Sequence, residues 1–386
     1  MISAEYDMHI TIVGGGVMGM SCAWRLAQRG IQVTLLEQGT LGKEASSAAI
    51  GALWPSSMPT PGPLQRLHHE SLRQYPHFVK ELSETTQRSI GYMRRGKFEL
   101  VTSDRHLTQA LKEVESASGS RSAPEGTPEH QPVMEWLSPD EARQLEPHVA
   151  VGEFGALICH RSAQIDVSDM LAALESACRQ SGVEIRPNTK VLSVDLDAAR
   201  PTVRLTDGEI EGDRLLICAG NGTPTLSQRL ERVAPIRPIK GQAMLISTRQ
   251  PVISHIVKNE AIFLVPWPDG RILVGSTTEP EAGFDISNTV SGVQFLTHGT
   301  VSTCPPLADA RIESIWAGLR PTGPKRKPLM GPLPERSNVY LCAGHFKVGI
   351  GMAPLAADLM TRWMLNETVT DDERQFIPQA DSDPRL

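Results

Sequence analysis

The sequence of 386 residues lacks three features that would place it in other classes of protein. It has no run of about 18 apolar residues, so a membrane-spanning helix is not expected. Lys and Arg do not form clusters and the formal net charge is −6, which argues against a nucleic-acid-binding surface. It also has no internal repeat.

Cysteine is sparse. The six cysteines at positions 22, 159, 178, 218, 304 and 342 form no C-x-x-C pair. This spacing argues against a zinc site and against a disulfide framework. We expect reduced, mostly buried thiols of a cytoplasmic protein and no bound metal. Apolar residues make up 40% of the chain and charged residues 21%, as in ordinary globular proteins, and the length suits two packed domains.

The first fifty residues hold the most specific pattern. Residues 10–13 are predicted to be a strand, and the G-x-G-x-x-G loop of residues 14–19 follows directly. A helix over 21–29 and a strand over 31–36 then lead to Glu37. In this βαβ order the glycines admit a pyrophosphate, the helix N-terminus donates N–H groups, and Glu37 can accept from ribose hydroxyls. The pattern predicts dinucleotide binding; the alternative is a tight turn with incidental glycines.

The segment after Glu37 favours FAD over a nicotinamide dinucleotide. A nicotinamide enzyme would continue into another helix and strand, whereas residues 43–54 form a long loop of small and hydroxyl-bearing residues. Such a loop can wrap a pyrophosphate and a flat flavin, with Ser46 and Ser47 as donors. Taken alone, this segment would be interpreted as a surface loop.

Several ordered motifs, spread over nearly the whole chain, resemble the FAD-dependent D-amino-acid-oxidase-like family. The resemblance is strongest to the branch that contains glycine oxidase and the flavin subunit of hydrogen cyanide synthase. The motifs are GGGVMG at 14–19 with Glu37, SSAAIG at 46–51, PIKGQ at 238–242, GRILVGSTT at 270–278, GFD at 283–285, WAGLRP at 316–321 and GHFKVGI at 344–350.

The resemblance implies an α/β fold with a Rossmann-type FAD-binding domain and a discontinuous α+β substrate domain built on an antiparallel sheet. The expected FAD-binding domain comprises residues 1–88, 145–225 and 312–386, and the expected substrate domain comprises 89–144 and 226–311. Within the latter, Asp269-Gly270 is predicted to be a hairpin turn. Residues 54–63, with four prolines, and residues 116–132 are predicted to be irregular loops, the second a mobile one.

The resemblance also implies how FAD is held. In related sarcosine oxidases a Cys soon after the arginine segment carries the flavin, but residues 321–324 contain none, so noncovalent binding is expected. The N–H groups of residues 344–351 and the dipole of the next helix are expected to stabilise negative charge on the flavin. The expected FAD-binding residues are Gly14, Gly16, Val17, Met18, Gly19, Glu37, Gln38, Ala45, Ser46, Ser47, Ile50, Gly51, Ala52, Val191, Ala219, Gly220, Gly344, His345, Phe346, Val348, Gly349, Ile350 and Gly351.

Arg320 is the first candidate for substrate binding, because its family counterpart pairs with the substrate carboxylate. A guanidinium matches a carboxylate in a bidentate way and so orients the α-carbon, while the flavin accepts the hydride. The alternative is a structural arginine paired with a nearby acid.

Two positions depart from the glycine oxidase pattern. Lys347, followed by Val348, stands where that branch usually has Arg, and an ammonium lacks the planar fork. Phe263 stands where a Tyr hydroxyl usually helps to hold the carboxylate. These departures predict a more apolar pocket for something other than free glycine, unless a neighbouring residue supplies the missing donor.

The predicted function is oxidation of the C–N bond of a small amino acid or amine to an imine, with O2 as acceptor giving H2O2. The imine would hydrolyse to a keto acid and ammonia. One alternative is a dehydrogenase subunit that passes electrons to a partner protein or a quinone. Another is a flavin-bearing scaffold without activity, against which Arg320 argues. Assembly into a homo-oligomer is left open.

Overall fold

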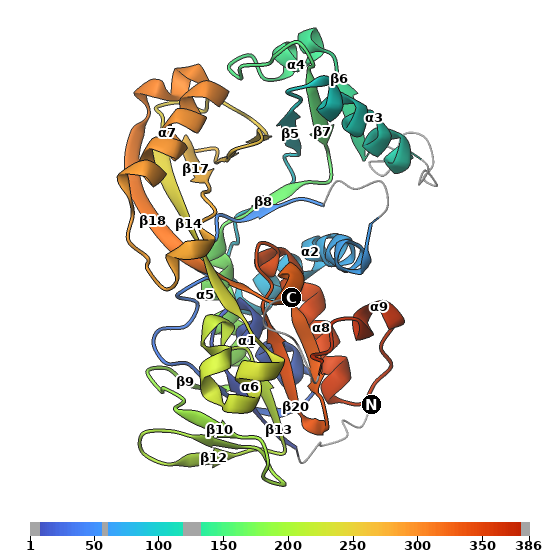
Figure 1. Cartoon of the computed structure of the whole chain (residues 1–386), viewed down its shortest axis with the longest axis vertical. Coiled ribbons are helices and arrows are strands. Elements are labelled where there is room, and N and C mark those ends of the chain that lie inside the picture. Colours follow the sequence, from blue (N-terminus) through green and yellow to red (C-terminus); the bar gives the residue numbers. More distant parts are fainter. Residues whose placement is uncertain (1–7, 56–60, 119–132, 380–386) are drawn as a thin grey trace.

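The computed structural model of the protein describes residues 8–55, 61–118 and 133–379. Two large sheets organise the chain, one in the lower and one in the upper half of Figure 1. Most of the loops predicted at 54–63 and 116–132, including the predicted mobility of the second, lies outside the described residues. Among those residues, no helix has the length and apolar character needed to cross a membrane.

The lower sheet has six strands in the order β19-β20-β13-β1-β2-β9, and only β19 runs antiparallel to its neighbour. The βαβ unit predicted from the first fifty residues is confirmed as β1, α1 (Val17–Gln28) and β2. The strands are β1 (His9–Val13), β2 (Gln32–Leu36), β9 (Glu184–Arg186), β13 (Arg214–Ile217), β19 (Leu329–Leu333) and β20 (Arg336–Ala343).

Apolar residues on both faces of its inner strands explain why this sheet is covered twice. Leu216 faces a core shared with α1, α2, α5 and α8, whereas Leu215 and Ile217 face a second core with α6, β10 (Ser193–Asp195) and β11 (Thr202–Arg204). This alternation follows from the two-residue period of a strand. The helices are α1 (Val17–Gln28), α2 (Pro63–Thr86), α5 (Val167–Gln180), α6 (Gln228–Val233) and α8 (Gly349–Met364).

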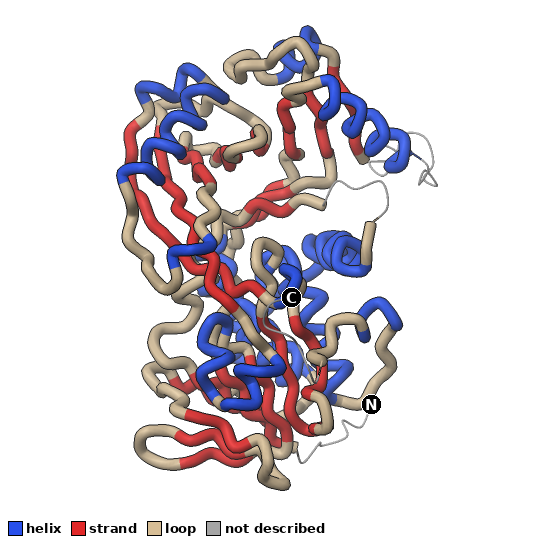
Figure 2. The backbone as a smooth tube through the Cα atoms, in the orientation of Figure 1, coloured by secondary structure: helices blue, strands red, loops and turns tan. Residues whose placement is uncertain are grey.

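The upper sheet has eight strands in the order β18-β14-β17-β16-β15-β5-β7-β6, and Figure 2 shows its long strands descending toward the lower half. It is antiparallel except for the β15–β5 pair. The predicted hairpin is confirmed: Asp269-Gly270 joins β16 to β17, and Gly270 has a φ of +86°. The strands are β5 (Lys97–Leu100), β6 (Met134–Leu137), β7 (Ala156–Cys159), β14 (Arg237–Ser247), β15 (Ile256–Lys258), β16 (Phe263–Pro266), β17 (Arg271–Gly275) and β18 (Arg311–Thr322).

Smaller elements complete the described chain. The helix α7 (Val290–Thr303) had no counterpart in the sequence prediction, because its Val, Thr and Gly residues favour a helix only weakly. The others are β3 (Ala52–Leu53), β4 (Tyr92–Met93), β8 (Ala163–Ile165), β10 (Ser193–Asp195), β11 (Thr202–Arg204), β12 (Glu209–Glu211), α3 (Asp104–Ser118), α4 (Pro139–Leu145), α9 (Asp371–Arg374), η2 (Gly220–Leu226), η3 (Pro280–Ala282), η4 (Pro305–Asp309) and η5 (Pro324–Arg326).

Two strands bear on where the domains divide. β18 falls in the segment 312–386 that the sequence placed with the FAD-binding domain, yet it pairs with β14 along its whole length. β7 falls in the segment 145–225, yet it pairs with β5 and β6 of the upper sheet. We therefore propose that both strands belong to the substrate domain, because ladder hydrogen bonds join them to its other strands.

Candidate active site

Two glycines of the loop between β1 and α1 allow its tight turn. Gly14 has a φ of +108°, and a Cβ atom there would lie 2.4 Å from the carbonyl oxygen of Cys218. A Cβ atom at Gly19 would lie 1.8 Å from the carbonyl oxygen of Gly14. Because a side chain at either position would collide with backbone, the close packing of this loop against β13 requires glycine.

The carboxylate of Glu37 lies against the same loop. It accepts hydrogen bonds from the backbone N–H groups of Gly15, at 2.8 Å, and Gly39, at 2.9 Å. A carboxylate has about four lone-pair directions, so these two bonds leave room for ribose hydroxyls. That Glu37 binds a ribose stays a prediction.

The N-terminus of α1 is suited to a pyrophosphate. Gly16, its N-cap, has no side-chain cap, and the Val17 N–H donates to the Ser46 hydroxyl at 3.0 Å. N–H groups in the first turn of a helix have no partner within the helix and attract anions. The described residues therefore fit the diphosphate of FAD, with Ser46 brought beside the helix.

The loop of residues 43–54 packs against the upper sheet instead of lying free on the surface. Trp316 Nε1 donates to the carbonyl oxygen of Ala48 at 3.0 Å, and a Cβ atom at Gly318 would lie 2.3 Å from the Ala48 Cβ. Ile50 reaches Gly275, where a Cβ atom would lie 2.3 Å from its Cδ1. These contacts join the predicted flavin loop to the strands that carry the predicted substrate residues.

The remaining predicted FAD-binding residues flank the lower sheet. Ala219 and Val191 pack against one core cluster, and Gly220 opens η2 with a φ of +51°. In the turn before α8, the Phe346 N–H donates to the carbonyl oxygen of Pro321 at 2.8 Å. The helix α8 begins at Gly349 without a side-chain cap, so its N-terminal N–H groups are available to a ligand.

Arg320, on β18, has its guanidinium held by neutral groups. Nη1 donates to the carbonyl oxygens of Lys240, at 3.3 Å, and Thr277, at 3.2 Å. Nη2 donates to the Ser276 hydroxyl at 2.7 Å. Burial lowers the pKa of Arg320 and the charge of Glu279 opposes this shift, but no described carboxylate forms an ion pair with it. Three of its five N–H donor positions are used, so the fork retains donors for a carboxylate.

Glu279 is the carboxylate whose charge acts on Arg320, but it contacts other side chains. Glu279 forms an ion pair with Lys240 at 3.5 Å and accepts from Gln242 Nε2 at 2.8 Å. The sequence analysis quoted Lys240 and Gln242 only as parts of a motif, and it assigned Ser276 and Thr277 no role. All four residues lie in two motifs of the family resemblance, PIKGQ at 238–242 and GRILVGSTT at 270–278. That position was the signal in the sequence that could have identified them.

Phe263 lies beside this strand end. Its ring packs edge-on against Trp54, with 5.0 Å between ring centroids, and its Cζ would lie 3.2 Å from a Cβ atom at Gly275. Gly275 precedes Ser276, the partner of Arg320, so Phe263 and Arg320 face neighbouring parts of one site. Trp54, which the sequence analysis mentioned only as the end of a loop, forms part of its wall.

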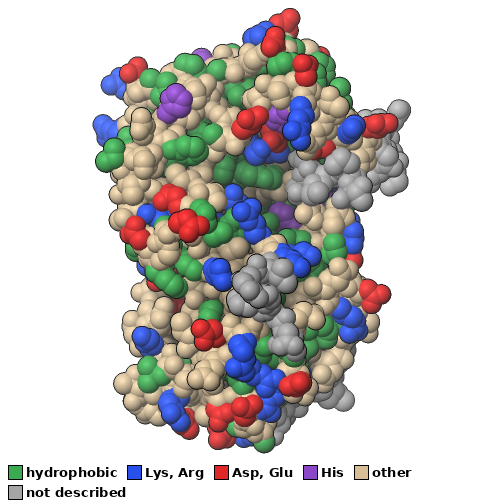
Figure 3. Space-filling model, in the orientation of Figure 1, with side chains coloured by type: hydrophobic (Ala, Val, Ile, Leu, Met, Phe, Trp, Pro, Cys, Tyr) green, Lys and Arg blue, Asp and Glu red, His purple; other side chains and the backbone are tan. Residues whose placement is uncertain are grey.

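Lys347, in the turn before α8, shares this region with other cations. Partial burial lowers the pKa of its ammonium, and so do Arg320, Arg326 and Lys258 in that order. The structure thus brings Arg320, Phe263 and Lys347 into one neighbourhood. Figure 3 shows a hollow between the upper and lower halves of the molecule with Lys and Arg side chains gathered around it.

A cluster of ion pairs in the upper sheet, on β5 and β15, lies beside Trp54. Lys97, whose side chain is 2% exposed, pairs with Glu99 at 2.5 Å, and Glu99 also pairs with Lys258. Burial disfavours the charged carboxylate, but Lys97 and Lys258 outweigh this effect and lower the pKa of Glu99 to about 2. Lys97 also lies 5.9 Å from the ring centre of Trp54.

Three cysteines that are far apart in sequence meet beneath the dinucleotide loop. The Sγ atoms of Cys22, Cys218 and Cys342 lie within 4.8 Å of one another, and all six cysteines are free and buried. Hydrogen bonds from Cys218 and Cys22 lower the pKa of Cys342, whereas burial raises that of Cys218. Their spacing gave no sign of this cluster, because each comes from a different element. That they hold no metal stays a prediction.

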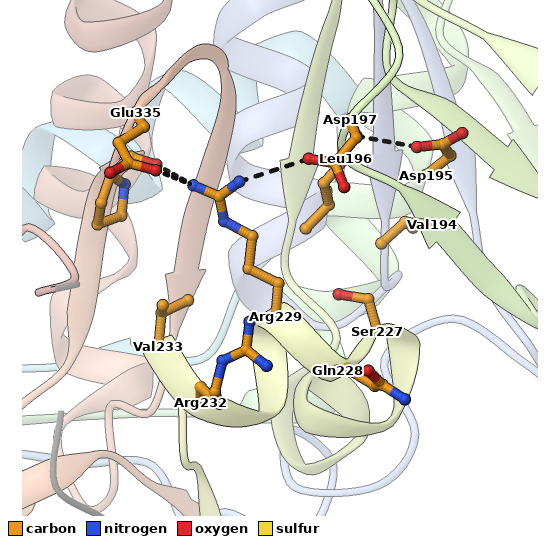
Figure 4. A pocket seen from close by; sticks show the side chains of 11 residues that line it. Val194, Asp195, Leu196, Asp197, Ser227, Gln228, Arg229, Arg232, Val233 and Glu335 are labelled. Atoms are coloured by element: carbon orange, nitrogen blue, oxygen red, sulfur yellow. Dashed lines mark hydrogen bonds and ion pairs between the residues drawn. The ribbon is translucent and has the colours of Figure 1, made fainter. Parts of the chain in front are cut away.

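Two grooves among the described residues are lined by none of the three predicted substrate residues. One, of about 510 Å3, runs between the loop of residues 43–54 and strands β17 and β18. The other, of about 730 Å3, is lined by ion pairs: Arg229 lies 3.5 Å from Asp197 and 3.2 Å from Glu335 (Figure 4). Because the Arg229 guanidinium in this second groove is already paired with two carboxylates, we assign the groove no ligand.

Comparison with known proteins agrees with this geometry. Residues 9–363 match the family model described as FAD dependent oxidoreductase. A glycine oxidase from Geobacillus kaustophilus is 30% identical over 365 residues, which cover 93% of each chain. The hydrogen cyanide synthase subunit HcnC of Pseudomonas aeruginosa is 28% identical over 415 residues, covering 97% of this chain and 96% of that protein.

Comparison with solved structures also finds glycine oxidase. The crystal structure of the glycine oxidase from Geobacillus kaustophilus superposes with a TM-score of 0.88 at 28% identity, covering 97% of this chain and 99% of that one. The family match confirms the predicted α/β fold and the predicted cofactor, FAD. The chain therefore belongs to the family of FAD-dependent oxidoreductases.

Proposed function

We propose that this protein oxidises the C–N bond of a small amino acid or amine to an imine, with O2 as the acceptor giving H2O2. The observation that carries the proposal is the guanidinium of Arg320, which is partly buried, held by neutral groups and free of a carboxylate partner among the described residues. A cation that is partly withdrawn from water and has no counter-charge is stabilised by an anionic ligand. The similarity of the whole chain to glycine oxidases agrees with an amino acid as the anionic ligand of Arg320.

In this proposal each part of the site has a role. Arg320 binds the substrate carboxylate with its remaining donors and so orients the α-carbon. Phe263 and Trp54 exclude water on one side of it. The loop of residues 43–54, the glycine-rich loop and the N-termini of α1 and α8 hold FAD noncovalently. FAD, when bound, supplies the acceptor for the hydride of the α-carbon.

An anaerobic substrate screen tests the proposal. Purified protein with its FAD is mixed with single amino acids and small amines without oxygen. A substrate is identified by loss of the flavin absorbance at roughly 450 nm, the band expected of any flavoprotein. We expect bleaching with at least one small amino acid. If none of the amino acids or amines bleaches the protein, the proposed function is wrong.

The acceptor is tested on the same samples. Admitting air to the reduced protein should restore the absorbance within seconds and give one H2O2 per flavin. Slow recovery in air, together with fast recovery when a quinone is added, would support the alternative of a dehydrogenase subunit. We keep a cytoplasmic location as part of this proposal, and assembly into a homo-oligomer stays open.

A further inference from the structure

We propose that Tyr75 and Ser71, on helix α2, are positioning residues that hold the first turn of α8 in the orientation in which its N–H groups meet FAD. The inference rests on one part of the proposed function, the binding of FAD at the N-terminus of α8. It goes beyond that part because both side chains are fully buried and act only through the helix.

The first observation is a proline inside α8. In an α-helix the carbonyl oxygen of one residue accepts from the N–H group of the residue four positions later. For Ile350 that residue is Pro354, which has no N–H group and whose ring crowds the same carbonyl. The first turn of α8 therefore lacks one of the hydrogen bonds that would tie it to the rest of the helix.

The second observation is that α2 provides hydrogen bonds on both sides of this proline. The Tyr75 hydroxyl donates to the carbonyl oxygen of Ile350 at 3.0 Å, and the Ser71 hydroxyl accepts from the Leu355 N–H at 3.3 Å. Tyr75 also lies 3.3 Å from the sulfur of Met170, a much weaker acceptor than a carbonyl. Because Tyr75 and Ser71 are buried, water cannot replace either bond.

The third observation links the Ile350 carbonyl to the N–H groups at the start of α8. The C=O of Ile350 and the N–H of Gly351 belong to one planar peptide unit, so a bond that fixes the first also orients the second. The Gly351 N–H is one of those at the helix start that have no partner within the helix. Because a hydrogen bond weakens as it bends, a turn free to tilt would stabilise negative charge on the flavin less well.

A close contact between α2 and Gly351 supports the same role. A Cβ atom at Gly351 would lie 2.5 Å from Nε2 of His68, so the two helices approach here because residue 351 has no side chain. His68 lies three residues before Ser71 and thus on the same face of α2. Burial, and to a lesser degree the charge of His69, lowers the pKa of His68 to about 4. The imidazole is therefore neutral at pH 7, and α2 contributes hydrogen bonds to this turn without adding a cation.

The midpoint potential of the bound flavin tests this inference without any substrate. It is measured on the FAD-loaded protein by stepwise reduction with dithionite in the presence of a reference dye. Tyr75→Phe keeps the ring and removes the hydroxyl. We expect this variant to bind reduced FAD about tenfold less tightly relative to oxidised FAD, which lowers the two-electron midpoint potential by about 30 mV. Ser71→Ala should lower it in the same direction, and an unchanged potential in Tyr75→Phe would overturn the inference.

Two further variants show whether the hydroxyl acts through α8. The hydroxyl of the buried Tyr340 donates to the carbonyl oxygen of Ser337 at 2.8 Å, outside α8, so Tyr340→Phe is the matched control and should keep the potential of the wild type. Pro354→Ala returns an N–H group to residue 354 and gives the Ile350 carbonyl its helical partner. In that background Tyr75→Phe should no longer shift the potential. Equal shifts with and without Pro354 would overturn the inference.

The outcomes separate this inference from the proposed function. Bleaching by an amino acid in the anaerobic screen, together with an unchanged potential in Tyr75→Phe, would overturn the role of α2 and leave the oxidation intact. The expected shift in potential, without bleaching by any amino acid or amine, would overturn the oxidation and leave the role of α2. If Tyr75→Phe does not fold, Ser71→Ala decides: a lowered potential supports the inference, and the potential of the wild type overturns it.

Discussion

Arg320 lies directly against the backbone of Gly241 on the neighbouring strand. A Cβ atom at Gly241 would lie 2.2 Å from Nη2 and 2.3 Å from Nη1 of Arg320. The guanidinium therefore fits over β14 only because residue 241 has no side chain, and this contact sets the direction in which its free donors point.

The first prediction concerns this contact. Gly241→Ala should displace Arg320 from Ser276 and raise the KM for the amino acid about tenfold or more, since the fork is no longer held for a carboxylate. FAD content, measured as the ratio of flavin to protein absorbance, should stay that of the wild type. Gly152→Ala, where an added Cβ meets no atom within 4 Å, is the matched control and should behave as the wild type. Unchanged kinetics in Gly241→Ala would show that Arg320 does not orient the substrate.

The second prediction removes the guanidinium itself. Arg320→Ala should retain FAD and raise the apparent substrate constant by roughly 10- to 100-fold, because a charge-assisted pair of about 1.5–3 kcal/mol is lost. Steady-state kinetics with the best substrate from the anaerobic screen provide the measurement. Kinetics close to those of the wild type would exclude Arg320 from the substrate site.

The third prediction concerns the cofactor. Denaturation of the yellow protein should release intact FAD into the supernatant, because no Cys stands at residues 321–324 and the described residues provide a noncovalent cradle. Chromatography of the supernatant identifies the nucleotide. Flavin that stays with the protein pellet would contradict noncovalent binding.

The fourth prediction concerns Phe263 and Lys347. Free glycine should be a poor substrate compared with sarcosine, because an apolar wall favours an added methyl group by about 0.8 kcal/mol and offers glycine no hydroxyl. In the double variant Phe263→Tyr, Lys347→Arg, the ratio of kcat/KM for glycine to that for sarcosine should rise, since a hydroxyl and a fork are restored. A wild type that already prefers glycine strongly would show that these positions do not set specificity.

The fifth prediction concerns the stability that the ion pairs of Glu99 give to the upper sheet. The pKa of Glu99 is lowered from its ordinary 4.5 to about 2, so its contribution is present above pH 4.5 and is lost as the pH falls toward 2. Glu99→Gln leaves the buried Lys97 unpaired and should lower the free energy of unfolding at pH 7 by about 3–5 kcal/mol.

Urea unfolding at several pH values tests the fifth prediction. The difference in free energy between the wild type and Glu99→Gln should shrink as the pH falls below 4.5. Glu209→Gln removes a carboxylate from the exposed pair with Arg204 and should change stability by less than about 1 kcal/mol at any pH. A difference that does not depend on pH would show that Glu99 is not charged in the folded protein.

Local patterns made much of the lower half predictable. The order of strand, glycine loop, helix, strand and Glu37 lies within one short stretch, so its structure follows from neighbouring residues. The Asp269-Gly270 turn is equally local. The helix α7 was not predicted, because its residues favour a helix weakly and its Thr289 cap is one hydroxyl among many in that region.

The roles of Arg320, Phe263 and Lys347 came from family resemblance, and only the folded chain shows that they meet. They lie on β18, on β16 and in the turn before α8, and long-range strand pairing brings these elements together. The same is true of Cys22, Cys218 and Cys342, whose sequence spacing predicts no cluster. The sequence by itself determined the dinucleotide-binding unit, because its contacts are local. The tertiary structure decided which distant side chains share a site, because that depends on the packing of two sheets.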